Sequence, residues 1–413
     1  MEAKKEIQVV KKKAGFNLRS LLIPALSVLT GLIIGALLII VTSESVYAAF
    51  GNSFGEGLAN CWQVVAAAYS SLFAGALGNP QRIITAIQGG EAIAIRRAIN
   101  PILESLVATT PYIFAGLAVA LGFRAGLFNV GVEGQLFMGA ISATFVGYAV
   151  TGLPAIIHLP LTFLAGFAGG ALWGFIPGWL KAKTGAHEVI NTIMMNWIAF
   201  RLTDWLLSGP MRRPDSGGMP ISPFIQASAE LPRFFPAPIR LHLGFILALL
   251  MAWLVWWFLF KTTWGYNLRT VGANPRAGRY AGMNIVNSTI LGMTLSGGLA
   301  GLAGANQVMG ISHNMVMGLS SGYGFDSIAL ALLGNSHPLG VVLASLLFGT
   351  LRSGATQMMV ATKIPIDIVS ILQALILMFV AAPAIIRGLY RLRAPKEGQE
   401  EGAVTIRSWG GGD

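Results

Sequence analysis

Long apolar runs separated by short polar connections dominate this chain of 413 residues. A run of about 18 residues or more is long enough to cross the hydrocarbon core of a bilayer as a helix. The pattern predicts about ten spans, with a margin of about 2–4 residues at each boundary. They are expected at residues 21–41, 105–122, 127–151, 158–180, 188–208, 241–261, 286–308, 323–336, 338–355 and 365–387. The eighth is short and ends in the sequence GNSHP, which indicates an interrupted helix shielded by protein or by a cavity.

Composition supports the same fold class, an all-α polytopic membrane protein. The chain is 54% hydrophobic and 11% charged, whereas a soluble protein carries about a quarter charged residues. The net charge of +11 does not indicate a nucleic-acid partner, because the basic residues lie mainly in the tail and in loops between spans, as orientation in a membrane requires. Cys61 is the single cysteine, so neither an internal disulfide nor a cysteine-based metal site is possible. No metal site is expected.

The distribution of basic residues predicts an orientation. Residues 1–20 form a basic cytoplasmic tail, 21–41 the first transmembrane helix, and 390–413 a second cytoplasmic tail. The run at 21–41 is longer than the core of a signal peptide. Residues 42–104 are expected to be an extracytoplasmic segment with a re-entrant or surface helix, since counting Leu58–Leu77 as a span would move the basic loop at 262–285 outside. Residues 105–389, which contain the other nine expected spans, form the core. The bias is incomplete, because Arg212, Arg213, Arg233, Arg240, Arg82, Arg96 and Arg97 fall in regions expected outside.

Glycines recur every four residues at Gly166, Gly170, Gly174 and Gly178. This spacing places them on one helical face, where the missing side chains allow another backbone to approach closely. The same spacing occurs at Gly31 and Gly35, Gly122 and Gly126, and Gly297 and Gly301. Such faces serve either tight static packing or the sliding of one helix on another.

The loop at 262–285 contains a short predicted helix. Asn274 can cap its start, Pro275 suits its first turn and Gly282 suits its end. Arg276 and Arg279 share a face, and Tyr280 and Met283 are apolar anchors. The features of this cytoplasmic loop are equally compatible with a docking helix for a partner protein and with a loop that binds lipid headgroups.

The segment Gly126–Ala140, GLFNVGVEGQLFMGA, places polar residues at membrane depth. Gly126, Gly131 and Gly134 permit a break in the helix, and Asn129 and Gln135 lie beside them. Glu133 is an intramembrane carboxylate, which by default suggests function. Arg124 precedes it and is its candidate partner. We expect Asn129, Glu133, Gln135 and Arg124 to have structural or gating roles, with Glu133 accepting freed backbone N–H groups.

A neutral polar stripe follows in the span at 188–208. Thr192, Asn196, Ala199 and Thr203 share one helical face, and Asn191 lies beside it. Such a stripe suits a hydroxylated substrate that must pass without being held tightly. The alternative is hydrogen bonding between helices, at about 0.6 kcal/mol for each bond. Asn306 and Gln307, at the outer end of the span at 286–308, are the other candidates for the substrate pathway.

Three sequences carry a family resemblance: GLFNVGVEGQ, NTIMMNWIA and LRTVGANPRAGRYAGMN, in that order. They resemble permease subunits of ABC importers, in particular the nucleoside and simple-sugar branch of the branched-chain amino acid/ribose-type permeases, over roughly Leu103 to Leu389. The resemblance implies a type II-like importer bundle of ten spans in a bacterial plasma (inner) membrane. It also implies an ABC ATPase subunit, a second permease subunit (homologous or identical) and an extracytoplasmic substrate-binding protein as partners, besides membrane lipid. The third motif implies ATPase coupling through Asn274, Pro275, Arg276, Arg279, Tyr280 and Gly282.

The chain itself cannot be the ATPase. A phosphate-binding P-loop needs a Gly-Lys pair, and this dipeptide is absent from the sequence. ATP and Mg²⁺ are therefore expected on the partner ATPase, with no cofactor bound by this chain and no enzymatic activity. The predicted function is nucleoside import by alternating access. The alternatives are import of ribose or another simple sugar, and a stand-alone secondary transporter, which would need an intramembrane ion site or internal repeats.

Overall fold

The computed structural model of the chain describes residues 18–365 and 367–392, so most of the two tails expected at 1–20 and 390–413 lies outside the described residues. The described part is helical, with two isolated β-bridges and no β-strand. The helices are α1 Leu18–Thr42, α2 Glu44–Asn52, α3 Phe54–Leu77, α4 Pro80–Gly89, α5 Ala92–Arg124, α6 Val132–Ala149, α7 Ala155–Thr184, α8 Glu188–Ser208, η1 Ala227–Ala229, α9 Gly244–Lys261, α10 Thr263–Ala273, α11 Pro275–Tyr280, α12 Ile285–Gln307, η2 Val308–Ser312, α13 Tyr323–Leu333, α14 Pro338–Thr362, α15 Asp367–Ala381 and α16 Pro383–Leu389.

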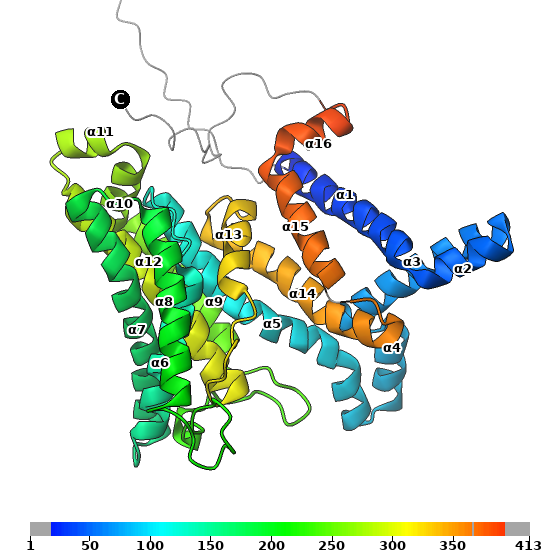
Figure 1. The fold of residues 1–413 in the computed structure, drawn as a ribbon, viewed down its shortest axis with the longest axis horizontal. Coiled ribbons are helices and arrows are strands. Elements are labelled where there is room, and N and C mark those ends of the chain that lie inside the picture. The colour runs from blue at the N-terminus through cyan, green and yellow to red at the C-terminus, as the bar shows by residue number, and fades with distance from the viewer. Residues whose placement is uncertain (1–17, 366, 393–413) are drawn as a thin grey trace, which may run out of the picture.

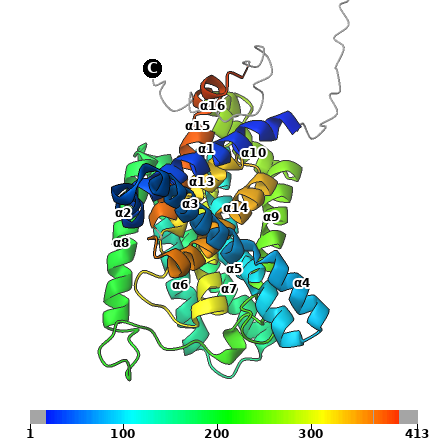
Figure 2. The same cartoon turned by 90° about the vertical axis from the view of Figure 1, so that its right-hand side faces the viewer.

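Helix α5 organises the fold. It runs obliquely between a group of upright helices, α6 to α12, and a second group that contains α1, α3, α14 and α15 (Figure 1). All residues from Thr109 to Phe123 on α5 are buried. The helix packs against α12, α6 and α9 on one side and against α14 and α3 on the other. The second view shows the same crossing, with α8 at the outside of the first group (Figure 2). A helix surrounded in this way is expected to be apolar on all faces, and the buried stretch from Pro111 to Phe123 is.

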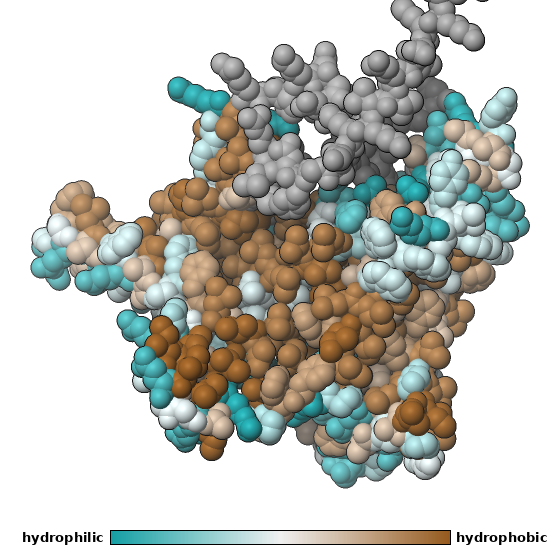
Figure 3. All heavy atoms as spheres, turned by 180° about the vertical axis from the view of Figure 1, so that it is seen from behind, coloured by the Kyte–Doolittle hydropathy of each residue, from teal (hydrophilic) through white to brown (hydrophobic). Residues whose placement is uncertain are grey.

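The expected all-α membrane fold is confirmed. Within residues 18–365 and 367–392, six helices are long and apolar enough to cross a membrane, or up to seven if the bent pair α3 and α4 is one span. Apolar side chains form a broad band on the surface, with hydrophilic side chains gathered above and below it (Figure 3). Helix length and hydropathy do not test the expected number of ten, because α13 and α15 are shorter apolar helices. The placement of residues 42–104 outside the membrane also stays a prediction; there α3 packs against α14.

Close helix packing occurs where the glycine spacing predicts it. A Cβ on Gly170 would meet the backbone of Gly297 and Gly301, and one on Gly174 would meet the backbone of Met293 and Gly297. Gly166 and Gly178 face the same helix, at Ala305 and Met293. Helices α7 and α12 therefore lie in close contact along about three turns of α7, and they touch backbone to backbone at Gly170 and Gly174. The small residues let this contact form without a gap.

Four helix boundaries differ from expectation by more than the stated margin. Helix α14 runs to Thr362 and not to residue 355, and α15 ends at Ala381 and not at residue 387, because a separate helix, α16, begins at Pro383. Helix α5 begins at Ala92, well before residue 105, because Pro101 is accommodated inside it. Helix α6 begins at Val132 and not at residue 127, because the backbone turns at Gly126, which has φ of +69°. By contrast, α8 has the predicted bounds of 188–208. Helix α13, the expected interrupted span, is preceded and followed by residues in the left-handed region, among them Gly322 and Asn335.

Candidate functional site

The start of α6 is held by a buried polar network. Asn129 Nδ2 donates to Gln135 Oε1 and to Ser296 Oγ, each at 2.8 Å, and Asn129 Oδ1 accepts from Gly131 N at 3.0 Å. Ser296 in turn donates to the Ala118 carbonyl of α5 at 2.7 Å. The amides therefore replace the helical hydrogen bonds that the turn before α6 lacks, as buried backbone groups require. The structural or gating roles expected of Asn129 and Gln135 stay predictions.

Asn196 on α8 clamps the same turn from the other side. Its Oδ1 accepts from Gly134 N at 2.8 Å, and its Nδ2 donates to the Val130 carbonyl at 3.0 Å. A Cβ on Gly134 would lie 2.9 Å from Cα of Asn196, so α6 and α8 approach closely here. The side chain is 2% exposed. In this conformation Asn196 bonds to protein with both ends of its amide.

Glu133 connects the first turns of helices α6 and α13. Its Oε2 accepts from Gly324 N at 2.6 Å, in the first turn of α13. The carboxylate thus lies at the start of both α6 and α13, where helix dipoles favour negative charge. The expectation that Glu133 accepts freed backbone N–H groups is met, but the expected pairing with Arg124 is wrong. Arg124 instead donates to the carbonyls of Ser336 at 3.0 Å and Asn335 at 3.1 Å.

The other stripe residues are also enclosed. Thr192 donates to the Glu188 carbonyl at 2.8 Å within its own helix, and Thr203 is 1% exposed with no hydrogen-bond partner for its hydroxyl. Asn191 Nδ2 is buried and unpaired. Asn306 is fully buried beneath Gly244 with both side-chain polar atoms unpaired. These residues are close-packed between helices, and none of them lines either of the two pockets described below.

The two stripe residues Asn196 and Thr203 should respond in opposite ways to loss of their polar atoms. Asn196→Leu leaves the Gly134 N–H and the Val130 carbonyl without partners, at about 1–3 kcal/mol for each group. Thr203→Val removes a buried hydroxyl that has no partner and should be neutral or stabilising. Thermal unfolding in detergent measures both. Equal midpoints for the two variants would contradict the clamp at Asn196.

A large cavity lies at the end of the bundle opposite α11. Its volume is about 880 Å³, and its walls come from the end of α3, the start of α4, the first half of α5, the loop before α9, the end of α12, the start of α13 and the side of α14. Most of its lining is polar: it includes Ser70, Ser71, Asn79, Arg82, Arg97, Asn100, Glu104, Arg240, Gln307, Tyr323, Arg352, Ser353, Thr356 and Gln357. Gln307 is thus the one predicted pathway residue that the structure brings to a cavity. Asn100 Oδ1 and Gln307 Oε1 are buried without a donor.

A charged and aromatic cluster forms one wall of this cavity. The Arg352 guanidinium lies 4.7 Å from the centroid of the Tyr323 ring, and Tyr112 and Tyr323 meet edge to face at 4.8 Å. Arg352 donates to Tyr112 Oη at 2.9 Å, and Tyr112 donates to Asp326 Oδ2 at 2.8 Å. The carboxylate of Asp326 compensates the arginine charge at 3.6 Å. The aromatic ring and the carboxylate together stabilise the arginine charge inside the protein.

Glu104 and Arg240 close the outer wall of the cavity. Arg240 donates to Glu104 through Nε at 3.1 Å and also through Nη2, so the pair is bidentate. These hydrogen bonds raise the pKa of Arg240. Arg82 and Arg97 also line the cavity and form no ion pair with the described residues.

The sequence offered a signal for part of this cluster. Asp326 and Arg352 are ionisable residues within predicted spans, and such residues are functional candidates by default. Their pairing was not readable, because it joins α13 to α14 and depends on Tyr112 from α5. The cavity depends on the position of α3, a segment whose sequence is compatible with either a re-entrant or a surface helix.

The helix predicted in the loop at 262–285 is present as α11. Asn274 caps it, accepting from Ala277 N at 3.1 Å, Pro275 occupies the first turn, and Gly282 ends it with φ of +77°. Arg276 and Arg279 are exposed, and Tyr280 is 97% exposed. With Pro275 and Ile285 they line a shallow pocket of about 490 Å³. The helix stands out from the end of the bundle (Figure 1).

Nothing in the described part of the chain resembles a metal centre. No group of three or more His, Cys, Asp and Glu side chains among these residues could hold a metal ion.

Comparison with known proteins identifies the sequence relatives. Residues 101–381 match the family described as Branched-chain amino acid transport system / permease component. The chain is 41% identical to the guanosine ABC transporter permease protein NupP of Bacillus subtilis, over 90% of this chain and 96% of that protein. It is 37% identical to the glucose ABC transporter permease protein TsgB13 of Haloferax volcanii, over 67% of this chain and 74% of that protein. It is 30% identical to the nucleoside ABC transporter permease protein NupB of Lactococcus lactis, over 89% of this chain and 92% of that protein. No solved structure matches the chain significantly.

Proposed function

Because this chain belongs to the family of branched-chain amino acid transport system permease components, we propose that it carries nucleosides across the plasma membrane of a bacterium. Its relatives are ABC transporter permeases, so the chain is a multi-pass membrane subunit of an ABC transporter and not an enzyme. Two of the relatives are named for guanosine or nucleosides, which supports this cargo. The relative named for glucose supports a second candidate, a simple sugar.

The observation that carries the proposal is the polar cavity with one aromatic wall. Asn100 and Gln307 line the cavity, and their side-chain oxygens are buried and unpaired in this conformation. Turned toward the cavity, these oxygens would accept hydrogen bonds from hydroxyl groups of a ribose. The planar guanidinium of Arg352 lines the cavity and lies over the Tyr323 ring, and it offers a surface against which a base can stack. A nucleoside has both parts and is uncharged, so it needs no carboxylate or free cation as its partner. A simple sugar would use the hydroxyl acceptors alone.

In this proposal the substrate enters from the cavity and leaves past α8. Gln307 meets it first, and Asn306 and the polar face of α8, comprising Asn191, Thr192, Asn196 and Thr203, become accessible when α6 and α8 separate. Their neutral polar groups offer weak binding, which suits passage. Glu133, Asn129, Gln135 and Arg124 hold the broken helices in position during this change. The closed packing of α6 on α8 would then be one of two alternating states.

The same proposal assigns a position on this chain to each partner protein. An ABC ATPase, which binds ATP and Mg²⁺, docks on Asn274, Pro275, Arg276, Arg279, Tyr280 and Gly282. A substrate-binding protein delivers cargo to the opposite end of the bundle.

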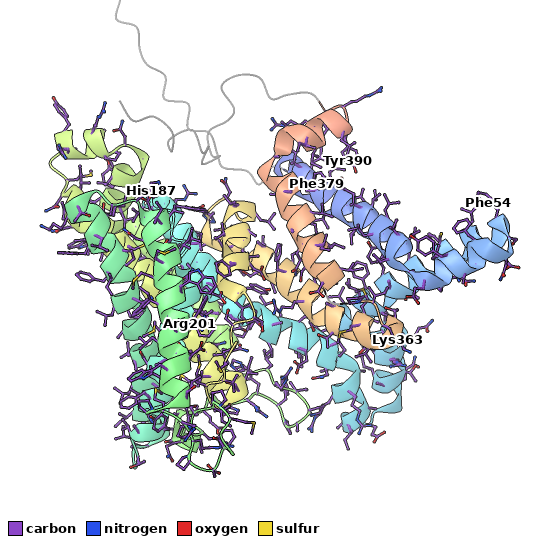
Figure 4. All side chains as sticks on the ribbon, in the orientation of Figure 1. Phe54, His187, Arg201, Lys363, Phe379 and Tyr390 are labelled. Atoms are coloured by element: carbon purple, nitrogen blue, oxygen red, sulfur yellow. The ribbon has the colours of Figure 1, made fainter. Side chains whose placement is uncertain are left out.

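A second permease subunit, homologous or identical, covers the outer face of α8. Arg201 lies midway along this helix (Figure 4), and its side chain is 80% exposed beside Asp204 at 3.8 Å. Arginine facing lipid at the centre of a span costs about 2.5–3.5 kcal/mol, so a protein partner there is favoured.

A substrate competition experiment tests the proposed cargo. Cells that express the complete transporter are given labelled guanosine with an excess of unlabelled adenosine, uridine, ribose or glucose. We expect the nucleosides to compete and the sugars not to compete. We also expect Gln307→Leu to reduce uptake at least about fivefold, since one hydrogen bond of about 1 kcal/mol is lost and an apolar group enters a polar wall.

The control variant for this experiment is Gln81→Leu, on the exposed surface of α4 outside the cavity. It should leave uptake unchanged. Competition by glucose or ribose at concentrations at which nucleosides do not compete would reject the nucleoside and favour the sugar.

A further inference from the structure

Helix α13 is a separate short rod within the bundle. It has 11 residues, about 16 Å of helix. Ser321 and Gly322 before it and Asn335 and Ser336 after it have φ between +48° and +91°. Backbone in this region is strained for residues other than glycine and does not continue a helix. The rod is therefore joined to the chain by a sharp turn at each end, and its position is set by contacts with neighbouring helices.

The first end of α13 belongs to the cavity. Tyr323 lines the cavity and Gly324 N donates to Glu133. Arg352, also in the cavity wall, donates to the Ser321 carbonyl at 3.2 Å. A Cβ on Gly324 would lie 2.5 Å from Cα of Glu133, so this end is also in tight contact with α6. A displacement of α13 would move Tyr323 against Arg352 and change the cavity.

The second end of α13 is held by Arg124. The planar guanidinium donates through Nε to the Ser336 carbonyl and through Nη2 to the Asn335 carbonyl. Both carbonyls lie in the turn that follows the helix, where no helical donor reaches them. These two hydrogen bonds fix the orientation of the turn as well as its distance from Arg124. Lysine cannot form the same pair, because its ammonium group lacks the planar fork of a guanidinium.

Arg124 is in turn fixed to the loop that carries α11. A Cβ on Gly126 would lie 2.6 Å from the carbonyl oxygen of Gly272, so the turn after Arg124 touches the last residues of α10 backbone to backbone. Ala125 and Leu127 form a buried cluster with Leu268 of α10 and Met293 of α12. Helix α11 follows α10 directly, and Gly278 packs over Val271. Because α11, α10 and the turn after Arg124 are closely packed, a movement of α11 also displaces Arg124.

We infer that Arg124 transmits the movement of α11 to α13, and that α13 is the element which opens and closes the inner end of the substrate cavity. This inference rests on the proposed function, because it takes α11 as the ATPase contact. It assigns to Arg124 a positioning role: the residue touches neither ATPase nor substrate and acts by holding the Asn335–Ser336 turn. A continuous set of packed contacts that ends in an element with two positions can carry coupling between distant sites.

The test compares Arg124→Gln with Arg124→Lys in the complete transporter reconstituted in liposomes. Three quantities are measured: ATPase co-purification, the ATP hydrolysis rate, and uptake of labelled guanosine. A fourth is the ATP-dependent change in amide hydrogen exchange over residues 322–333. We expect Arg124→Gln to retain the ATPase and hydrolysis while uptake falls at least tenfold and the exchange of α13 no longer responds to ATP. Arg124→Lys should recover part of the uptake.

The control is Lys183→Gln, which removes one positive charge at the exposed end of α7, at the same end of the bundle as α11. It should behave as the unmodified chain does. Uptake within twofold of normal in Arg124→Gln, or an unchanged response of α13 to ATP in that variant, would overturn the inference. If Arg124→Gln does not fold, full uptake by Arg124→Lys would overturn it. Failure of the proposed function is distinguishable, because then the unmodified chain would neither retain an ATPase nor take up guanosine.

Discussion

The double variant Arg276→Glu, Tyr280→Ala is expected to fold and insert normally but to lose its ATPase during purification. Tyr280 is 97% exposed at the tip of α11, although tyrosine normally buries its ring. Aromatic and arginine side chains are the common energetic anchors of an interface, with more than about 2 kcal/mol lost on truncation of each. Loss of about 4 kcal/mol would weaken binding by about three orders of magnitude. Co-purification and substrate-stimulated hydrolysis are the measurements.

A lipid contact at α11 predicts a different result for the same variant. Loss of headgroup binding would lower stability in the membrane slightly and leave the ATPase bound. The control is Lys183→Glu, Trp179→Ala, which makes the same kind of charge reversal and aromatic truncation at exposed positions near the end of α7. It should retain the ATPase. Normal retention and hydrolysis in the α11 variant would show that the coupling contact lies on another loop.

Gly301→Ala is expected to destabilise the bundle by about 1–3 kcal/mol, although alanine normally favours a helix over glycine by about 1 kcal/mol. The added Cβ would meet backbone atoms of Gly166 and Gly170 on α7, and Gly139 of α6 packs against Gly301 from another side. Backbone on two helices cannot rotate away as a side chain can. The loss should appear as a lower midpoint of thermal unfolding in detergent and as less protein in the membrane.

Gly55→Ala is the matched control for Gly301→Ala. It lies within α3, and a Cβ there meets no atom within 4 Å. Because only the helix preference acts, this variant should be neutral or slightly stabilising. Equal effects of the two substitutions would mean that α7 and α12 do not touch at Gly301 as the structure has it.

The sequence predicted the elements that depend on interactions between residues close together in the chain. The cap at Asn274 and the stop at Gly282 gave α11, the glycine spacing gave the face of α7, and α8 has its predicted bounds. Each of these depends on residues within a few positions of one another or on a fixed helical period. The fold class followed from apolar run length alone.

Contacts between distant segments were not readable in the same way. Arg124 was expected to pair with Glu133 because the two are near in sequence, but it binds carbonyls more than two hundred positions away. Every residue has a backbone carbonyl, so the sequence does not indicate which carbonyls accept a hydrogen bond from an arginine. The cavity depends on where α3 lies against α14, and an apolar helix of that length is compatible with a span, a re-entrant segment or a surface helix.

The central claim is that this chain moves nucleosides only as part of an ATP-driven complex. The direct measurement is uptake of labelled guanosine into liposomes that contain this chain with its partner permease, ATPase and binding protein, with Mg-ATP supplied on the ATPase side. We predict accumulation with Mg-ATP and none with a non-hydrolysable ATP analogue or with an imposed proton or sodium gradient. Accumulation driven by an ion gradient in liposomes that contain this chain alone, without ATP, would contradict the claim and identify a secondary transporter.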